Sequence, residues 1–261
     1  MIKIFRKIRY NLMSENKTSK YFKYAIGEII LVMIGILLAL QVNNWNQKRL
    51  ERIEEKIILS NLKEDFESAI VEFKSLNSLR EDVIYAAKAI YEVDIKDIEN
   101  YHSRYLDSLL LKTLTAPTFN NQAGSLNVLL TSGKINLIAN QPLKKKLIEW
   151  PGDVADMTED EINHSNLYVD KYCNILDKYI SWNTVFKHGT NGGSRFKERL
   201  IKKMEDNAMV SSDYKLLLED KVFLNTLRRR AIYCELTNGE TTILIEKAEN
   251  IITSINKELN N

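Results

Sequence analysis

The feature that most constrains this chain is an apolar segment near its N-terminus, AIGEIILVMIGILLALQV, which spans Ala25–Val42. A helix needs about 20 residues to cross roughly 30 Å of hydrocarbon, and Tyr24 and Asn43 extend the segment to that length. Aromatic residues flank it on both sides, as is typical at the level of lipid headgroups: Tyr21, Phe22, Tyr24 and Trp45. We therefore predict a transmembrane helix over residues 24–44.

Two other structures fit an apolar segment of this length. A buried core helix is disfavoured because residues 29–40 have no polar face. A cleaved signal peptide is disfavoured because 24 residues precede the segment and no small-x-small cleavage pair follows it. The segment therefore predicts an uncleaved, single-pass anchor.

The orientation follows from the Lys and Arg residues that flank the segment. Seven precede it and four follow within a similar distance; the seven are Lys3, Arg6, Lys7, Arg9, Lys17, Lys20 and Lys23. This bias predicts a cytoplasmic N-terminus at the inner membrane and an extracytoplasmic domain over residues 45–261. Residues 1–23 are either a short amphipathic helix on an anionic leaflet, with Ile4, Phe5, Ile8 and Leu12 on its apolar face, or a basic flank that serves only topology. Nucleic-acid binding is not expected, because the basic run is short and adjacent to the membrane.

The rest of the chain predicts an all-α fold. Nine glycines and three prolines occur in 261 residues, and no run alternates with period two. We expect the transmembrane helix to continue as one long helix to about residue 93, followed by an antiparallel helical bundle. Further helices are predicted over 95–114, over 125–132 with Gly133 as a left-handed cap, and from Asn140 onward. A flexible loop is predicted near 187–195, KHGTNGGSR. Gly189 is followed after four residues by Ser194-Arg195 rather than by the Gly-Lys-Ser of a phosphate-binding loop.

The C-terminal helix has the most regular pattern. A heptad seam predicts a coiled-coil helix that continues through Asn238-Gly239; the seam residues are Leu227, Ala231, Cys234, Asn238, Thr241, Ile245, Ala248, Ile252, Ile255 and Leu259. Pro151-Gly152, in contrast, puts the continuity of the preceding helix in doubt.

The chain contains few residues that indicate chemistry. The three histidines, His102, His164 and His188, are scattered. In the acidic run 153–164, Asp160 and His164 share a helix face and allow a metal site, but a capping box of Thr158 and Glu161 is the favoured interpretation. We predict no catalytic, cofactor-binding or metal-binding residues and no cofactor.

Two cysteines, Cys173 and Cys234, lie on apolar seams. A disulfide between them is permitted in an extracytoplasmic domain, and two buried free thiols are the alternative that we favour.

Glu28 is the single carboxylate within the apolar segment. It shares a helix face with Gly35 and Ala39, a small-xxx-small pair that permits close helix contact. One hypothesis is self-association, or contact with another membrane subunit, through this face. The other is that Glu28 lies near the cytoplasmic interface and extends to it.

Two sequence blocks resemble a family of single-pass membrane proteins common in Bacteroidota-type bacteria, catalogued as a domain of unknown function. The first is KTSKYFKYAIGEIILVMIGILLALQVNNWNQKR at 17–49, and the second is PTFNNQAGSLNVLLTSGKINLIANQPLKKKLIEW at 117–150. The resemblance implies a membrane protein with a helical domain and supplies no activity.

Two functions fit these features. The first is an extracytoplasmic interaction or sensor-like module that works with a partner protein, by self-association or with another chain, while anchored in the lipid bilayer. The alternative is a membrane-bound enzyme with a metal-dependent site in the bundle, since such sites form from distant residues.

Overall fold

The computed structural model describes residue 10 and residues 18–120, 124–189 and 211–260, and every regular element in these ranges is a helix. This confirms the predicted all-α fold. The chain divides into two compact units, Met1–Ile57 and Ile58–Asn261. The apolar face predicted for the amphipathic helix, Ile4, Phe5, Ile8 and Leu12, lies outside the described residues.

Helix α2 spans Thr18–Tyr91 without a break and supplies residues to both units. Its first part carries the apolar segment, and it is long and apolar enough to cross a membrane. None of its most apolar 18-residue window is buried inside the structure, so protein packing does not account for this composition. The predicted continuation of the apolar helix into one long helix is therefore confirmed.

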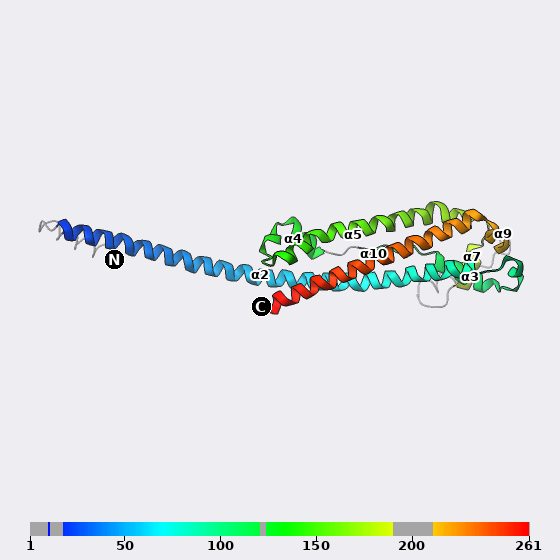
Figure 1. The fold of residues 1–261 in the computed structure, drawn as a ribbon, viewed down its shortest axis with the longest axis horizontal. Coiled ribbons are helices and arrows are strands. Elements are labelled where there is room, and N and C mark those ends of the chain that lie inside the picture. The colour runs from blue at the N-terminus through cyan, green and yellow to red at the C-terminus, as the bar shows by residue number, and fades with distance from the viewer. Residues whose placement is uncertain (1–9, 11–17, 121–123, 190–210, 261) are drawn as a thin grey trace. The chain divides into compact units, whose positions relative to one another are not determined.

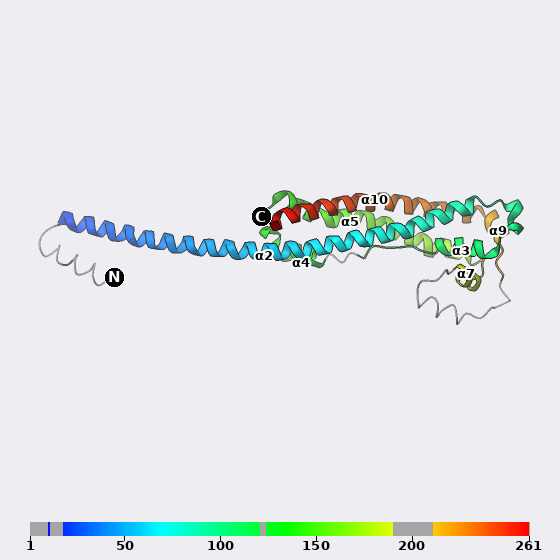
Figure 2. The same ribbon diagram turned by 90° about the horizontal axis from the view of Figure 1, so that it is seen from below.

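In the second unit, the later part of α2 is followed by a series of helices (Figures 1 and 2). In chain order these are η1 (Ile95–Asn100), α3 (Ser103–Thr113), α4 (Gly124–Thr131), η2 (Lys134–Leu137), α5 (Gln141–Leu167), η3 (Tyr168–Cys173), α6 (Asn174–Leu176), α7 (Trp182–Gly189), α9 (Tyr214–Glu219) and α10 (Lys221–Asn260). Three long helices, α2, α5 and α10, lie side by side along this unit, while α3, α7 and α9 gather at one end (Figures 1 and 2).

Cross-helix contacts fix the direction of each long helix. Asn140 donates a hydrogen bond to Glu258 at 2.8 Å, whereas Lys247 pairs with Asp153 at 2.7 Å, so α5 and α10 are antiparallel. On α2, Phe66 contacts Trp150 and Arg80 contacts Glu161, so α2 and α5 run in the same direction. The antiparallel contacts of the predicted bundle are therefore those of α10, which runs opposite to both α2 and α5.

The bundle contains two apolar clusters separated along its length. The first joins α2, α4, α5 and α10 around Phe66, Phe73, Trp150 and Leu244. The second joins the end of α2 with α3, the η3–α6 segment, α9 and the start of α10 around Tyr172, Phe223 and Leu227. Between these clusters lie the buried polar residues described below.

Several predicted helix boundaries are confirmed. The Asn140 side chain accepts a hydrogen bond from Leu143 N at the start of α5, where Pro142 occupies the first turn. Gly133 has φ +73°, as the left-handed cap requires.

The single helix predicted over 95–114 is wrong. Asp94 caps η1 and His102 caps α3 by accepting a hydrogen bond from Arg104 N, so two local caps divide the segment. The predicted loop at 187–195 also begins too early, because α7 continues to Gly189; residues 190–195 lie outside the described residues.

Pro151-Gly152 does not interrupt α5, which runs unbroken from Gln141 to Leu167. Both residues are exposed, whereas Trp150 and Val154 beside them are buried in the apolar core. Packing on either side therefore holds the helix through a residue that lacks an N–H donor.

The C-terminal helix α10 is continuous through Asn238-Gly239, as predicted. Its heptad seam is correct at six of the ten predicted positions, because Leu227, Ala231, Cys234, Thr241, Ala248 and Ile255 are buried. At three of the other positions the buried residues are Thr237, Leu244 and Ile251, each one residue before the predicted seam residue. Ile245, Ile252 and Leu259 are partly buried at the edge of the core. The buried face is therefore broader than a coiled-coil seam.

A π-helical segment, η3, follows α5 directly and continues into α6. A π turn holds more residues than an α turn, and such segments often occur at functional sites. Here it brings Tyr168 and Tyr172 to the same buried arginine, Arg230.

Candidate functional site

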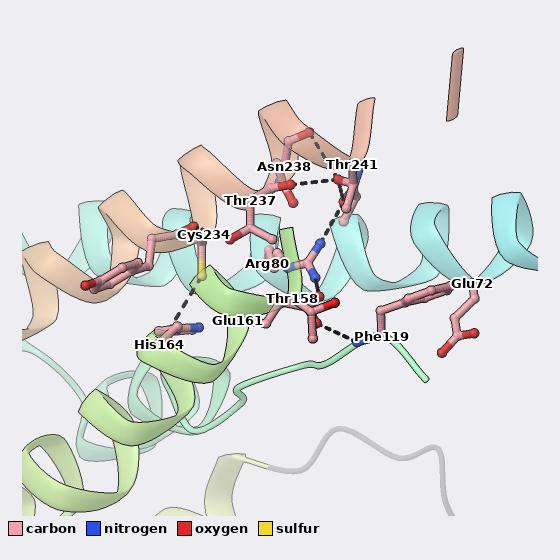
Figure 3. A network of polar contacts seen from close by, with 12 residues as sticks. Glu72, Arg80, Phe119, Thr158, Glu161, His164, Cys234, Thr237, Asn238 and Thr241 are labelled. Atoms are coloured by element: carbon pink, nitrogen blue, oxygen red, sulfur yellow. Dashed lines mark hydrogen bonds and ion pairs between the residues drawn. The ribbon is translucent and has the colours of Figure 1, made fainter. Parts of the chain in front are cut away.

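A layer of buried polar side chains lies between the two apolar clusters and joins α2, α5 and α10 (Figure 3). Its centre is an ion pair between Arg80 of α2 and Glu161 of α5, whose side chains are both 1% exposed. Arg80 also donates to Asn77 Oδ1 at 3.0 Å, and Thr241 Oγ1 donates to the same oxygen at 2.6 Å. The Arg80–Glu161 pair thus joins α2 to α5, and Asn77 connects Arg80 to Thr241 of α10.

Glu161 also anchors the extended connection between α3 and α4. Its Oε2 accepts a hydrogen bond from the Phe119 backbone N at 2.8 Å (Figure 3). The predicted capping box of Thr158 and Glu161 is therefore wrong: both residues lie inside α5, and the Thr158 hydroxyl donates to Val154 O at 2.6 Å. Glu161 is used for a long-range contact, which its local sequence does not reveal.

Burial governs the titration of this ion pair. Desolvation raises the pKa of the Glu161 carboxyl, opposed by the Phe119 hydrogen bond and by Arg80. Desolvation likewise lowers the pKa of the Arg80 guanidinium, opposed mainly by Glu161. Each side chain therefore depends on the other to remain charged in the core.

A second buried arginine, Arg230 of α10, contacts only neutral groups among its described partners. It donates to the backbone carbonyls of Thr113 and Thr115, the latter at 2.6 Å, and to His164 Nε2 at 3.3 Å. Its guanidinium carbon also lies over two aromatic rings, 4.6 Å from the centroid of Tyr168 and 4.5 Å from that of Tyr172. Backbone dipoles and ring faces thus replace a carboxylate as the partners of this cation.

Cys234 and His164 lie close together, with Sγ and Nε2 4.0 Å apart (Figure 3). Burial, with help from Arg230 and Arg80, lowers the pKa of His164 to about 3, and burial raises the pKa of the Cys234 thiol to about 11. A reactive cysteine needs a thiolate and an imidazole free to take its proton. This pair has neither, because the thiol is neutral and His164 Nε2 accepts from Arg230.

The other predicted site residues do not form a metal site in the described ranges. Within those ranges no group of three or more His, Cys, Asp or Glu side chains is placed to hold a metal ion. His164 points into the core, where it contacts Arg230, while Asp160 is half-exposed. Cys173 and Cys234 are free cysteines, Cys173 half-buried and Cys234 buried.

An acidic groove of about 770 Å³ lies over the first apolar cluster, floored by Phe66, Phe119 and Trp150. Two of its carboxylates have a structural role: Asp65 accepts from Ser125 N and Glu72 accepts from Asn120 N, both at 2.9 Å. These hydrogen bonds hold the ends of the connection to α4.

An apolar row is exposed on α10, on the face opposite to its buried residues. Ile232, Leu236 and Ile243 are all exposed, and Gly239 lies between them with open space around its Cα. Spacings of four, three and four residues place these positions on one helix face. This row offers a contact surface on the second unit.

In the first unit, Glu28 is half-exposed and Ala39 is exposed on α2, and nothing lies within 4 Å of a Cβ built at Gly35. The face predicted for helix contact is therefore present on an unbroken helix.

The two buried arginines are the functional candidates that the sequence reasoning missed. Arg80 lies four residues after Leu76 and three before Val83, within the buried stripe of α2, whereas the neighbouring Leu79 is exposed. The sequence does contain a sign of such a site, which is a charged residue at a helical position that faces the core.

No curated protein and no solved structure matches this chain. Residues 28–150, which begin within the first resembling block and end with the second, match a family described as a "Family of unknown function (DUF6090)".

Proposed function

We propose that this chain is a single-pass inner-membrane protein whose helical bundle is an extracytoplasmic interaction or sensor-like module that works with a partner protein. The observation that carries the proposal is α2, in which the apolar segment and core residues of the bundle belong to one unbroken helix. The apolar segment is therefore joined to the bundle core by continuous helix, with no intervening loop. The resemblance to single-pass proteins of Bacteroidota-type bacteria supports the membrane placement.

The exposed apolar row on α10 supports a partner-binding role for the bundle. Isolated surface hydrophobic residues are ordinary, but a row on one helix face opposite to the core is typical of a contact surface. Gly239 within this row allows the backbone of a second element to approach closely.

A site-specific photo-crosslinker tests this surface. It is placed at Leu236 in the tagged full chain within native membranes, and at Glu249 as a control on the exposed side of the same helix away from the row. We expect one discrete adduct from position 236 and little from position 249, with the captured protein identified by mass spectrometry. Equal labelling at both positions, or none at 236, would contradict the proposed surface.

The alternative, a membrane-bound enzyme with a metal-dependent site, receives less support. The Cys234–His164 pair is the closest approach to a reactive constellation in the described residues, and both side chains are buried and neutral. Metal analysis of the purified chain discriminates the two functions, since stoichiometric zinc or iron would favour the enzyme.

A further inference from the structure

Within the first unit, α2 exposes an apolar stripe directly after the predicted membrane segment. Leu50, Ile53 and Ile57 are 48%, 47% and 58% exposed. Their spacings of three and four residues place them on one face, and Asn43 and Asn46 precede them in the same heptad register. Such a stripe lies beyond the hydrocarbon, where water would otherwise contact it.

This stripe continues the face predicted for contacts within the membrane. Eighteen residues correspond to about five turns of an α-helix, so positions that far apart lie directly above one another. Gly35 is aligned with Ile53, Ala39 with Ile57, and Glu28 with Asn46. The small residues in the membrane and the apolar residues after it therefore share one side of α2.

We propose that Leu50, Ile53 and Ile57 form the seam of a short, parallel, two-stranded coiled coil with a second copy of this chain. In this register Asn43, Leu50 and Ile57 occupy a positions, and Asn46 and Ile53 occupy d positions. An Asn at an a position is a known determinant of register and of oligomer state in coiled coils.

The residues that flank the seam have the charges that a second copy would complement. Arg49 is at a g position, and Glu54, five residues later, is at the following e position. In a parallel pair, g of one helix meets the following e of the other, so each dimer forms two Arg49–Glu54 contacts between copies. Two copies anchored with the same topology are necessarily parallel.

The seam is short because the next heptad positions are Ser60, Glu64 and Glu67. A two-heptad coiled coil is weak in dilute solution, but tethering both helices in one bilayer raises their effective concentration. The inference therefore rests on the proposed membrane anchoring.

Cysteine crosslinking of the full chain in native membranes tests the seam. Leu50→Cys and Ile53→Cys are compared with Lys48→Cys, an exposed f position on the opposite side of the same helix, and with the parent chain. Under mild oxidation we expect at least five-fold more covalent dimer from the two seam variants than from Lys48→Cys. Equal dimer at all positions, or none at the seam, would overturn the proposal; the latter result would assign the stripe to a different partner.

Charge reversal identifies the partner as a second copy. Arg49→Glu should reduce the crosslinking of Ile53→Cys several-fold by placing like charges at g and e, and adding Glu54→Arg should restore it. Failure of the double reversal to restore crosslinking would overturn the self-pairing. Alkaline extraction of the same membranes tests anchoring separately: a chain released by alkali contradicts the proposed function, whereas a retained chain without crosslinks contradicts only the coiled coil.

Discussion

Arg80 and Arg230 are both fully buried in the bundle, yet their charges are stabilised in different ways. Arg80 has a carboxylate partner, Glu161, whereas Arg230 contacts carbonyl oxygens, aromatic faces and a neutral imidazole. Removing one member of a buried ion pair leaves an uncompensated charge and costs more than the pair itself contributes. The Arg80–Glu161 pair is therefore more sensitive to single substitution than to joint replacement.

Glu161→Gln should lower the free energy of unfolding by about 3–5 kcal/mol, because the buried Arg80 guanidinium loses its counter-charge. Adding Arg80→Met to this variant should recover part of the loss. Chemical unfolding of the detergent-solubilised full chain measures both. Glu159→Gln, at an exposed position on the same helix, is the control and should change stability by less than about 0.5 kcal/mol. A Glu161→Gln variant as stable as this control would show that the ion pair is dispensable.

His164 should make the bundle less stable in mild acid. Its pKa is about 3 in the folded chain and near the ordinary value of 6.5 when unfolded, so protons bind the unfolded state preferentially between these values. The contribution of the buried, neutral His164 to the free energy of unfolding is fully present above pH 6.5 and is lost as pH falls toward 3. Between pH 7 and pH 5 we expect the free energy of unfolding to fall by about 2 kcal/mol through this residue.

His164→Gln keeps an acceptor for Arg230 Nε and removes the titration. Its unfolding free energy should therefore change less between pH 7 and pH 5 than that of the parent chain. His102→Gln, at an exposed helix cap, should retain the parental pH dependence. An unchanged pH dependence in His164→Gln would contradict the depressed pKa.

Some helix boundaries that local residues determine were predicted correctly, whereas the local caps at Asp94 and His102 were not recognised. Asn140 and Gly133 act through their own side chain or backbone, so their roles can be read from a few neighbouring letters. Glu161 could not be assigned in this way, because its partners are 81 residues away at Arg80 and 42 residues away at Phe119. For α10, the pattern predicted one continuous helix, but only packing against both α2 and α5 decides which alternate positions are buried.

Glycine substitutions distinguish helix interiors from turns. Gly239→Ala should raise the free energy of unfolding by about 0.5–1 kcal/mol, because Gly239 lies inside α10 with open space for a methyl group. Gly133→Ala should instead lower it by about 1–2 kcal/mol, since its φ of +73° strains any residue with a Cβ. Thermal unfolding of the two variants provides the comparison. A loss of stability in Gly239→Ala would mean that α10 is not a regular helix at that point.

For the whole chain, the proposed topology depends on a difference of seven Lys and Arg residues against four. A C-terminal fusion should be active with a periplasmic reporter and inactive with a cytoplasmic one. Replacing Lys17, Lys20 and Lys23 with Gln removes the difference and should produce a mixed topology. Activity of the parent fusion only in the cytoplasmic reporter would reverse the proposed orientation.

The π-helical segment Tyr168–Cys173 has a consequence for how the chain tolerates changes in length. A π turn accommodates one more residue than the α turn it replaces, so deletion of the exposed Asp170 or Lys171 would let the segment close into ordinary α-helix. The π-helical segment thus accommodates the extra residue locally, and α5 keeps its register with α10. Such a deletion would weaken the contacts of Arg230, because the extra residue places the rings of Tyr168 and Tyr172 together against its guanidinium.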